Sequence, residues 1–467
     1  MKDNFNTNHV NKENMLPNKN CINFELTNLT NKRIGICSQE TIVIGYCELG
    51  IKLSLDMFYS INIQNDKINT NNLECKNNYE YDKCNIHLFD LKYNNSYSNI
   101  EKILHNKIEL SNNMYNNYSD IINRCNVYNL NTAVFCNFFD YRNELNNLDY
   151  VGNTLNNILE KYDNLNNIIL NYDGNLSSNV FLLENLSILN GKPYIMHNVF
   201  SSFKSFKEYN THELINFANT IDKLIENSDL CNILDFDKYI DDRIQTYMSH
   251  NSMYDVNSSN NYNYTSKSIL NILNNLFFDN KILNNNVNNI RDITKILAPY
   301  PRIKFCSTSF ISDDVISMNN NLYEYNNLIL DKKYNLGYYT DTSIDNKLIG
   351  CYTILKGNYW NTNHCEKLNA TIGNKHTYNN KLVLDSSIIK NNKSINDNLT
   401  ITSIINNKSN LFNNECNWLD ILKSNKIRKE INNYFNKYNI DTIDSLIFNC
   451  DDLKSDYITI NEFMEYQ

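Results

Sequence analysis

A glycine-bearing turn near the start of the chain has the composition needed to hold a phosphate group. Residues 41–45 (Thr-Ile-Val-Ile-Gly) predict a buried strand, and a turn containing Gly45 and Gly50 follows it. Apolar residues then continue to Phe58 in a pattern that favours a helix. A strand, a glycine turn and a helix often form the entrance to a nucleotide-binding domain. The same succession also occurs as plain scaffolding, so this stretch alone leaves both interpretations open.

A second stretch suited to the same chemistry lies at residues 167–179. An apolar strand runs into a loop that carries Asp173, Gly174 and Ser178, and a helical pattern follows. A phosphate loop needs glycines because successive backbone N–H groups must converge on the anion without side chains in the way. Gly174 is the one glycine of this loop. Asp173 adds a negative charge, which disfavours an anionic ligand.

A proline-containing turn at residues 296–305 (Ile-Leu-Ala-Pro-Tyr-Pro-Arg-Ile-Lys-Phe) holds two of the four prolines in the chain. Apolar residues at helical spacing precede it at 269–277 and 290–297, which predicts two amphipathic helices. Pro299 ends the second helix, and Pro301 keeps the following chain extended. Residues 303–310 then alternate apolar and polar, which predicts a strand.

This succession of helix, acidic turn, helix, Pro-Tyr-Pro-Arg-Ile-x-Phe and strand resembles the intermediate domain of tubulins. Further short blocks are similar to the same family. They are the strand 85–92 with Asp90, the Tyr-Val-Gly-Asn sequence at 150–153, and Glu-Asn-Ser-Asp at 226–229 followed by Asp235. The resemblance covers most of the chain from Gly35 to Gln467, strongly at about five short blocks and thinly between them.

The resemblance implies an α/β fold: a Rossmann-type, nucleotide-binding-like domain, an α/β intermediate domain and C-terminal helices. The implied domains are a disordered extension (1–34), a tubulin/FtsZ-type GTPase-like domain (35–235), a central helix with the intermediate domain (236–412) and a C-terminal helical segment (413–467). The sequence predicts further strands at 132–136, 193–200, 348–357 and 399–404, and helices at 155–162, 214–225, 236–247, 418–422 and 427–438.

The resemblance also implies a GTP site, and the site it implies is degenerate. Lys92 stands where the family has a carboxylate, and Asp173 lies in the loop reduced to one glycine. Phe236 replaces the asparagine that binds guanine in the family, and a phenyl ring offers no hydrogen-bond donor or acceptor. We therefore expect GTP to bind weakly or not at all. The nucleotide-binding-like positions are Gly45, Cys47, Gly50, Asp90, Gly174, Ser177, Ser178, Asp235 and Phe236.

Asp292 is the one catalytic candidate. It precedes Pro299 by seven residues, where alpha-tubulin carries its activating glutamate. In the family this acid acts on nucleotide bound by the next subunit, so the resemblance implies a role in trans. A solvated helix charge explains a single aspartate equally well.

Composition and the remaining motifs argue against several classes of function. A net charge of −9 and a pI near 5.5 argue against nucleic-acid binding. No apolar run reaches the ~18 residues of a membrane span. Thirteen scattered cysteines, without a C-x-x-C pair, predict reduced and mostly buried thiols. Residues 451–462 resemble the end of an EF-hand, but Leu453 and Asp456 occupy positions that need a ligand and a glycine. We expect no metal site.

We therefore expect a highly divergent tubulin-superfamily protein, closest to the minor delta or epsilon types. It would associate with tubulin subunits, microtubules, or basal-body, centriole and spindle-pole structures in the cytoplasm. One alternative is a non-polymerising adaptor without nucleotide, similar to the misato-like relatives. A polymerising GTPase is the least favoured, because Lys92, Asp173 and Phe236 each remove part of the site.

Overall fold

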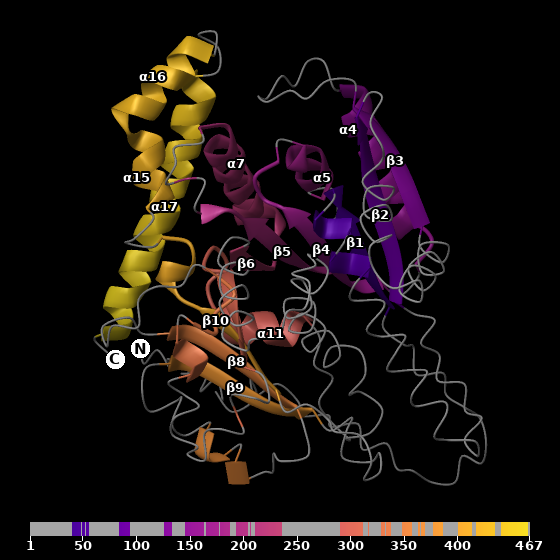
Figure 1. Ribbon diagram of the computed structural model, residues 1–467. Helices are drawn as coiled ribbons and strands as arrows, with labels where there is room; N and C mark the ends of the chain where they lie inside the picture. Colours follow the sequence, from indigo (N-terminus) through magenta and orange to yellow (C-terminus); the bar gives the residue numbers. More distant parts are fainter. Residues whose placement is uncertain are drawn as a thin grey trace, which may run out of the picture. The chain divides into compact units, whose positions relative to one another are not determined.

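In the computed structural model the chain divides into two units, Met1–Ser38 and Gln39–Gln467. The residues that the structure describes all belong to the second unit (Figure 1). They are residues 40–47, 49–51, 53–55, 84–93, 126–132, 145–162, 165–176, 178–186, 193–203, 206, 211–235, 290–311, 316, 328–331, 333–337, 348–356, 363–364, 366–368, 377–385, 400–412, 417–434 and 440–465.

The strands of these residues form one ten-stranded sheet in the order β3-β2-β1-β4-β5-β6-β7-β10-β8-β9. Neighbours from β3 to β7 are parallel, β10 is antiparallel to β7 and β8, and β8 and β9 are parallel. The predicted α/β class is therefore confirmed, with a mostly parallel sheet. The strands are β1 Glu40–Tyr46, β2 Cys84–Tyr93, β3 Asn126–Thr132, β4 Leu165–Asp173, β5 Tyr194–Ser201, β6 Leu230–Asp235, β7 Phe305–Ile311, β8 Leu348–Lys356, β9 Thr377–Asp385 and β10 Thr400–Asn406.

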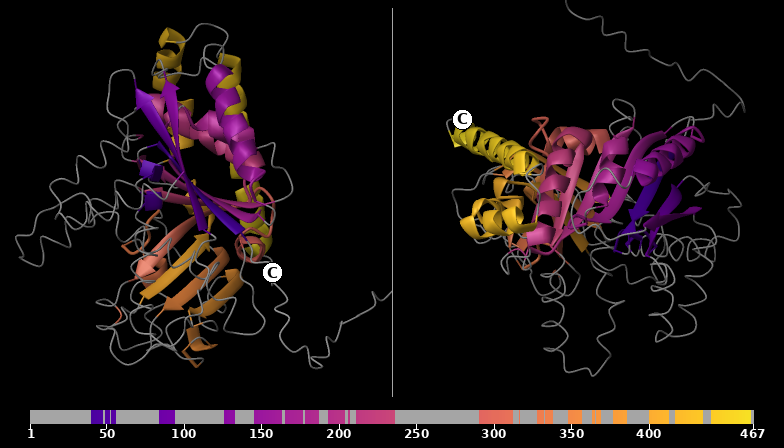
Figure 2. Two further views of the ribbon diagram at one scale, coloured as in Figure 1. Left: turned by 90° about the vertical axis from the view of Figure 1, so that its right-hand side faces the viewer. Right: turned by 90° about the horizontal axis from the view of Figure 1, so that it is seen from above.

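Helices cover both faces of this sheet (Figure 2). Successive side chains of a strand point to opposite faces, and those of β4 divide between two apolar clusters. The first cluster includes α4 (Leu145–Leu159), α5 (Asn179–Leu186), α7 (Thr211–Asn227), α15 (Trp418–Lys423) and α17 (Ile440–Glu465). The second cluster includes the helical residues 49–55 and α11 (Ile290–Leu297).

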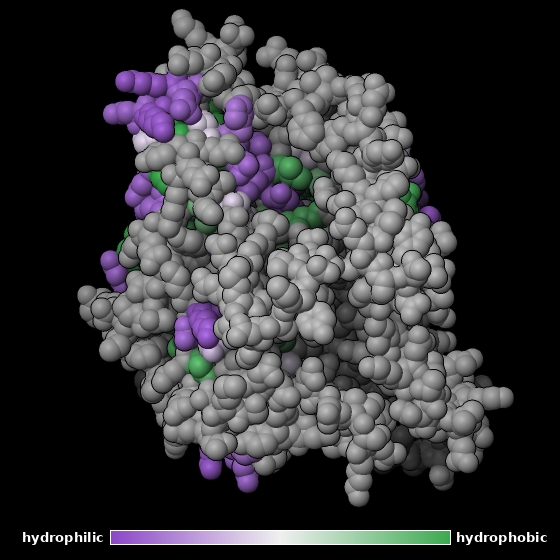
Figure 3. All heavy atoms as spheres, viewed as in Figure 1, coloured by the Kyte–Doolittle hydropathy of each residue, from purple (hydrophilic) through white to green (hydrophobic). Residues whose placement is uncertain are grey.

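The C-terminal helices form a layer that is joined by ion pairs. Lys423 of α15 pairs with Asp451 of α17. Arg428 Nη2 of α16 (Asn425–Tyr434) lies 3.4 Å from Asp444 Oδ1 of α17. The outward side of α16 is polar, and Figure 3 shows hydrophilic side chains gathered where Figure 1 places this helix. Within the described part of the chain, no helix has the length and apolar character needed to cross a membrane.

Strand β7 confirms the strand expected after the proline-containing turn. Every residue from Phe305 to Ile311 is buried. Two of its polar residues bind inside the protein: Ser307 Oγ donates to Asn410 Oδ1 at 2.9 Å, and Thr308 Oγ1 donates to Asn232 Oδ1 at 2.9 Å. A strand with helices on both sides of its sheet is buried on both faces.

Most predicted elements are confirmed with small shifts of their ends. Of the strand expected at 132–136, only Thr132 is described, as the last residue of β3, and residues 133–136 lie outside the described part of the chain. Strand β9 was not predicted. The EF-hand-like residues 451–462 lie within the continuous helix α17. The helices predicted at 236–247 and 269–277 lie outside the described residues.

Candidate functional site

The carboxyl ends of β1, β4, β5 and β6 meet at one edge of the sheet, because these four strands are parallel neighbours. Within this edge, Asp173 pairs with Phe200 and Ser201 with Asp235 in the strand register. Ligands of open α/β sheets bind outside this edge. The structure therefore brings together most of the predicted nucleotide-binding-like positions, namely Gly45, Cys47, Gly50, Gly174, Ser178 and Asp235.

The two predicted loops touch each other directly. The Tyr46 hydroxyl donates to the backbone oxygen of Ser178 at 2.8 Å, and Cys47 Sγ lies 3.8 Å from Ser178 Oγ. Cys47 has a φ of 61°, in the left-handed region that few residues other than glycine adopt. This unusual conformation turns the chain sharply from β1 into the following helical residues. Tyr46 was not singled out in the sequence.

The structure describes no side chain at three of the predicted positions. Asp90 lies on β2 with its backbone paired to Asn129 of β3, and its side chain is outside what the structure describes. Ser177 and Phe236 lie outside the described residues altogether.

Three backbone donors of the loop after β4 are occupied. The N–H of Gly174 donates to Phe200 O at 2.7 Å, that of Asn175 to Asp173 Oδ1 at 2.9 Å, and that of Asn179 to Leu176 O at 3.3 Å. A phosphate site depends on such N–H groups pointing at the anion. These three donors bind other protein atoms instead, and we call this arrangement the closed loop.

Side chains from α7 and β5 hold the loop in this closed form. Asn216 Nδ2 donates to Asn175 O at 3.0 Å, and Thr220 Oγ1 donates to Gly174 O at 2.9 Å. Ser201 Oγ donates to Asn175 Oδ1 at 3.1 Å. Asn216 and Thr220 were not predicted from the sequence. They lie on α7, 41 and 46 residues after the loop residues they bind, so no local pattern marks them.

Asn179 contributes from the loop's own end. Its Nδ2 atom donates to the backbone oxygen of Asp173 at 2.7 Å and contacts Thr220 Oγ1 at 3.3 Å. Asn179 is fully buried at the first position of α5. The start of this helix therefore carries an amide that binds back to β4 rather than an open approach for an anion.

The glycines of both loops are explained by close packing of the chain on itself. A Cβ atom added at Gly50 would lie 1.9 Å from the backbone oxygen of Asn171. One added at Gly174 would lie 2.7 Å from Val199 Cγ1 and 3.1 Å from Phe200 O. Real Cβ atoms do not approach other atoms so closely. Packing of protein against protein therefore requires these glycines without any bound phosphate.

The charge at this edge also opposes an anion. The pKa of Asp173 is raised to about 6, mainly by burial; the hydrogen bond from Asn175 N–H acts against this shift and the nearby Glu213 adds to it. Asp173 is consequently ionised in a large fraction of molecules at neutral pH. A carboxylate beside the loop repels a phosphate group rather than binding it.

A row of buried amides crosses the sheet beside the glycine turn. Asn171 Nδ2 donates to Ser54 Oγ at 2.9 Å, Asn198 Nδ2 to Asn171 Oδ1 at 2.9 Å, and Asn232 Nδ2 to Asn198 Oδ1 at 3.1 Å. Thr308 completes the row on β7. All five side chains are buried. We call these residues the asparagine ladder, and its members are structural because each satisfies its neighbour.

Asp292 lies on α11, the helix that the sequence predicted before Pro299. This helix is far from both loops along the chain. Its partly exposed carboxylate lies 3.3 Å from Lys295 Nζ, one turn later. The turn after this helix also follows the prediction, because α11 ends at Leu297 and Phe305 is fully buried on β7. Asp292 therefore lies on a different element from the two loops, although α11 and the helical residues 49–55 contribute to the same apolar cluster.

Metal chemistry has no support in the described residues, where no three His, Cys, Asp or Glu side chains gather closely enough to hold an ion. Five described cysteines are buried free thiols. Burial raises the pKa of Cys231 to about 12, which leaves this thiol protonated and unreactive.

Neither the comparison with protein-family models nor that with curated proteins finds a match for this chain. The residues and their geometry are therefore the basis for proposing its function.

Proposed function

We propose that this chain is a highly divergent tubulin-like cytoskeletal protein of the cytoplasm that does not use GTP. Its role is to associate with tubulin subunits or with microtubule-based structures such as basal bodies and spindle poles. Three features support the proposal: the Pro-Tyr-Pro-Arg-Ile-x-Phe turn that joins α11 to β7, the mostly parallel α/β sheet, and two loops in contact at its carboxyl edge. The closed loop after β4 is the observation that separates it from an active GTPase.

The first expected result is that purified protein binds neither GTP nor GDP with micromolar affinity in isothermal titration calorimetry. The N–H groups of Gly174 and Asn175 are occupied, and the carboxylate of Asp173 repels phosphate. A nucleotide-dependent rise in melting temperature would be equally absent, because a ligand that does not bind the folded state does not stabilise it.

A glycine at position 173 should partly reopen the loop. Asp173→Gly removes the charge and frees the Asn175 N–H, so we expect weak binding of inorganic phosphate that wild type lacks. Asp331→Gly is a matched control, because Asp331 Oδ1 accepts the N–H of Lys333 at 2.9 Å in a similar turn elsewhere. Tight GTP binding by the wild type would contradict the closed-loop interpretation.

The second expected result concerns Asp292 and a conventional tubulin partner. We propose that α11 faces the nucleotide of the neighbouring subunit, where a carboxylate orients the attacking water. Asp292→Asn should then leave co-pelleting with microtubules unchanged and abolish any stimulation of the partner's GTP turnover. Its folding should change little, since exposed ion pairs such as that with Lys295 contribute only about 0.5 kcal/mol.

Lys295→Gln is the control, because it removes the cation from the same helix turn and leaves the carboxylate. Equal stimulation by wild type and Asp292→Asn would remove the role in trans. Failure of the wild type to pellet with microtubules would favour the adaptor without microtubule contacts.

A further inference from the structure

Strands β6 and β7 meet along an unusually short line. They pair only at Cys231 with Phe305 and at Asn232 with Cys306. Strands β5 and β6 pair at six positions, and β8 and β9 at eight. Since β6–β7 is the one junction between the strands β1–β6 and the strands β7–β10, it is the weakest line of main-chain hydrogen bonds within the described sheet. We call this junction the seam.

A separate segment fills the space where the two strands diverge. Asp235 N–H donates to Leu336 O at 2.8 Å, and Leu336 N–H donates to Thr308 O at 2.7 Å. The chain at Leu336 thus lies between β6 and β7 and bonds to both. Gly337 is required there, because an added Cβ would lie 2.7 Å from Ser307 Cβ and 2.9 Å from Ile233 O. The seam is filled by an inserted segment rather than by continuous strand pairing.

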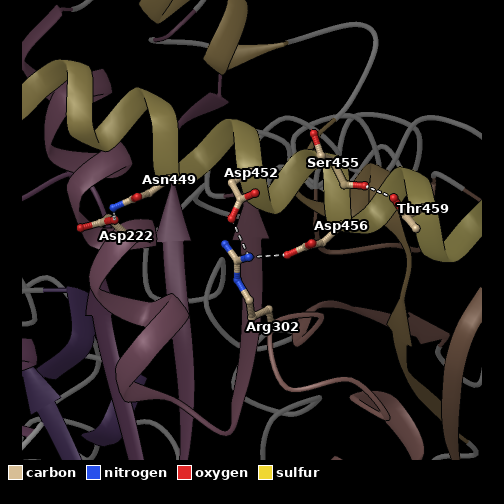
Figure 4. Close-up of polar contacts among 7 residues, drawn as sticks. All are labelled: Asp222, Arg302, Asn449, Asp452, Ser455, Asp456 and Thr459. Carbon is tan, nitrogen blue, oxygen red and sulfur yellow. Dashed lines mark hydrogen bonds and ion pairs between the residues drawn. The ribbon is translucent and has the colours of Figure 1, made fainter.

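Helix α17 crosses the seam and binds on both sides of it. On the first side, Asn449 Nδ2 donates to Asp222 Oδ1 of α7 at 2.7 Å (Figure 4). On the second side, the Tyr457 hydroxyl accepts the N–H of Phe305 at 3.2 Å. Tyr457 is fully buried, two turns along the helix from Asn449. One continuous helix is therefore attached to both parts of the sheet.

Arg302 provides an ionic attachment between these two contacts. Its Nη1 atom lies 2.7 Å from Asp452 Oδ2 and 2.6 Å from Asp456 Oδ2, and Figure 4 shows both carboxylates reaching it from α17. The two aspartates are four residues apart, so they share one face of the helix and repel each other without a cation. Arg302 belongs to the turn that leads into β7. We call Arg302, Asp452 and Asp456 the arginine clamp.

We propose that α17 is a strap across the seam, and that release of the arginine clamp lets strands β7–β10 open independently of β1–β6. Direct pairing of β6 with β7 is two residue pairs long, and the Leu336 segment and the Asn232–Thr308 contact also join the two strands. The strap adds a buried tyrosine, an amide contact and two ion pairs across the same line. The ion pairs are partly exposed, so charge neutralisation or high salt weakens them first. The proposal does not depend on nucleotide or on a tubulin partner.

Native-state hydrogen exchange on the full chain tests the strap. Arg302→Met should speed exchange in β7, β10 and α17 by about fivefold, the size expected for loss of partly exposed ion pairs. Exchange in β1, β4 and β5 should stay at the wild-type rate. High salt should give the same regional pattern in wild type and little further change in the variant. Asp452→Asn with Asp456→Asn should reproduce the pattern, and serves where Arg302→Met folds poorly.

Lys423→Met is the matched control. It removes the ion pair between Lys423 and Asp451, which lies on α17 beside Asp452 but joins the helix to α15 and not to β7. This variant should speed exchange in α15 and leave β7 unchanged. A uniform increase across all strands with Arg302→Met, or no increase in β7, would overturn the proposal.

Discussion

Replacing Gly50 by alanine should destabilise the fold by about 3 kcal/mol or more, which is the upper range for adding atoms to a closely packed interior. The added methyl group would lie 1.9 Å from the backbone oxygen of Asn171 and 2.7 Å from its carbonyl carbon. Both atoms belong to the backbone of β4 and cannot rotate away as a side chain does. The helical residues after β1 would have to lift from the sheet, which breaks the contact between Ser54 and Asn171.

Urea unfolding of Gly50→Ala against wild type measures this loss, and Gly152→Ala is the control. An added Cβ at Gly152 would lie 2.5 Å from Asn185 Oδ1, the end of a side chain that can move. Alanine is also favoured over glycine inside a helix by about 0.5–1 kcal/mol, so Gly152→Ala should change stability little. If Gly50→Ala unfolds like wild type, the glycine is not kept for packing and a ligand would have to explain it.

Acid should destabilise the protein through its buried histidines. Burial lowers the pKa of His197 to about 3 and that of His87 to about 4, and nearby Lys304 and Lys161, respectively, act in the same direction. The unfolded chain then binds more protons than the folded chain between these values and pH 6.5. Stability therefore falls as the pH falls below 6.5, by about 2 kcal/mol per histidine at pH 5.

His197→Asn isolates this effect, because its amide can still contact the Tyr172 hydroxyl that lies 3.0 Å from His197 Nδ1. The difference in unfolding free energy between wild type and variant should shift in the variant's favour by about 2 kcal/mol from pH 7.5 to 5. The comparison uses the difference between variant and wild type because both chains contain Asp173, Asp222 and Asp229. The raised pKa values of these carboxyl groups increase stability as the pH falls, which opposes the effect of the histidines. In Tyr172→Phe the unfolding free energy should depend on pH as it does in wild type, since burial is the main cause of the lowered pKa of His197. If this pH dependence were lost in Tyr172→Phe, the Tyr172 hydroxyl would be its cause.

The positions of most strands along the chain and of the two loops could be predicted from sequence, because their signals are local. Runs of buried apolar residues mark β1, β4 and β5, and Pro299 marks the end of α11. The closed state of the loop could not be predicted, because it depends on Asn216 and Thr220 reaching back from α7. Asparagine is abundant in every part of the chain, so nothing in the sequence distinguishes the amide of Asn216 from those on the surface.

The burial of the polar residues of β7 could not be predicted for a related reason. Ser307, Thr308 and Ser309 are polar, yet all three are buried. Asn410 and Asn232, which lie far away in the sequence, supply the partners of Ser307 and Thr308. Sequence periodicity shows which residues of a strand are polar, but not whether distant residues will supply hydrogen-bond partners for them.

The asparagine ladder makes folding of the parallel strands interdependent. The amides of Asn171, Asn198 and Asn232 meet only when β4, β5 and β6 hold one register. A shift by one residue in any strand would move its amide into an apolar cluster on the other face, at a cost of about 1–3 kcal/mol for each unpaired group. Chains rich in asparagine readily form wrong strand pairings between molecules. The ladder therefore gives this sheet an internal check on alignment, because a misaligned strand leaves unpaired amides when the apolar faces close over it and exclude water.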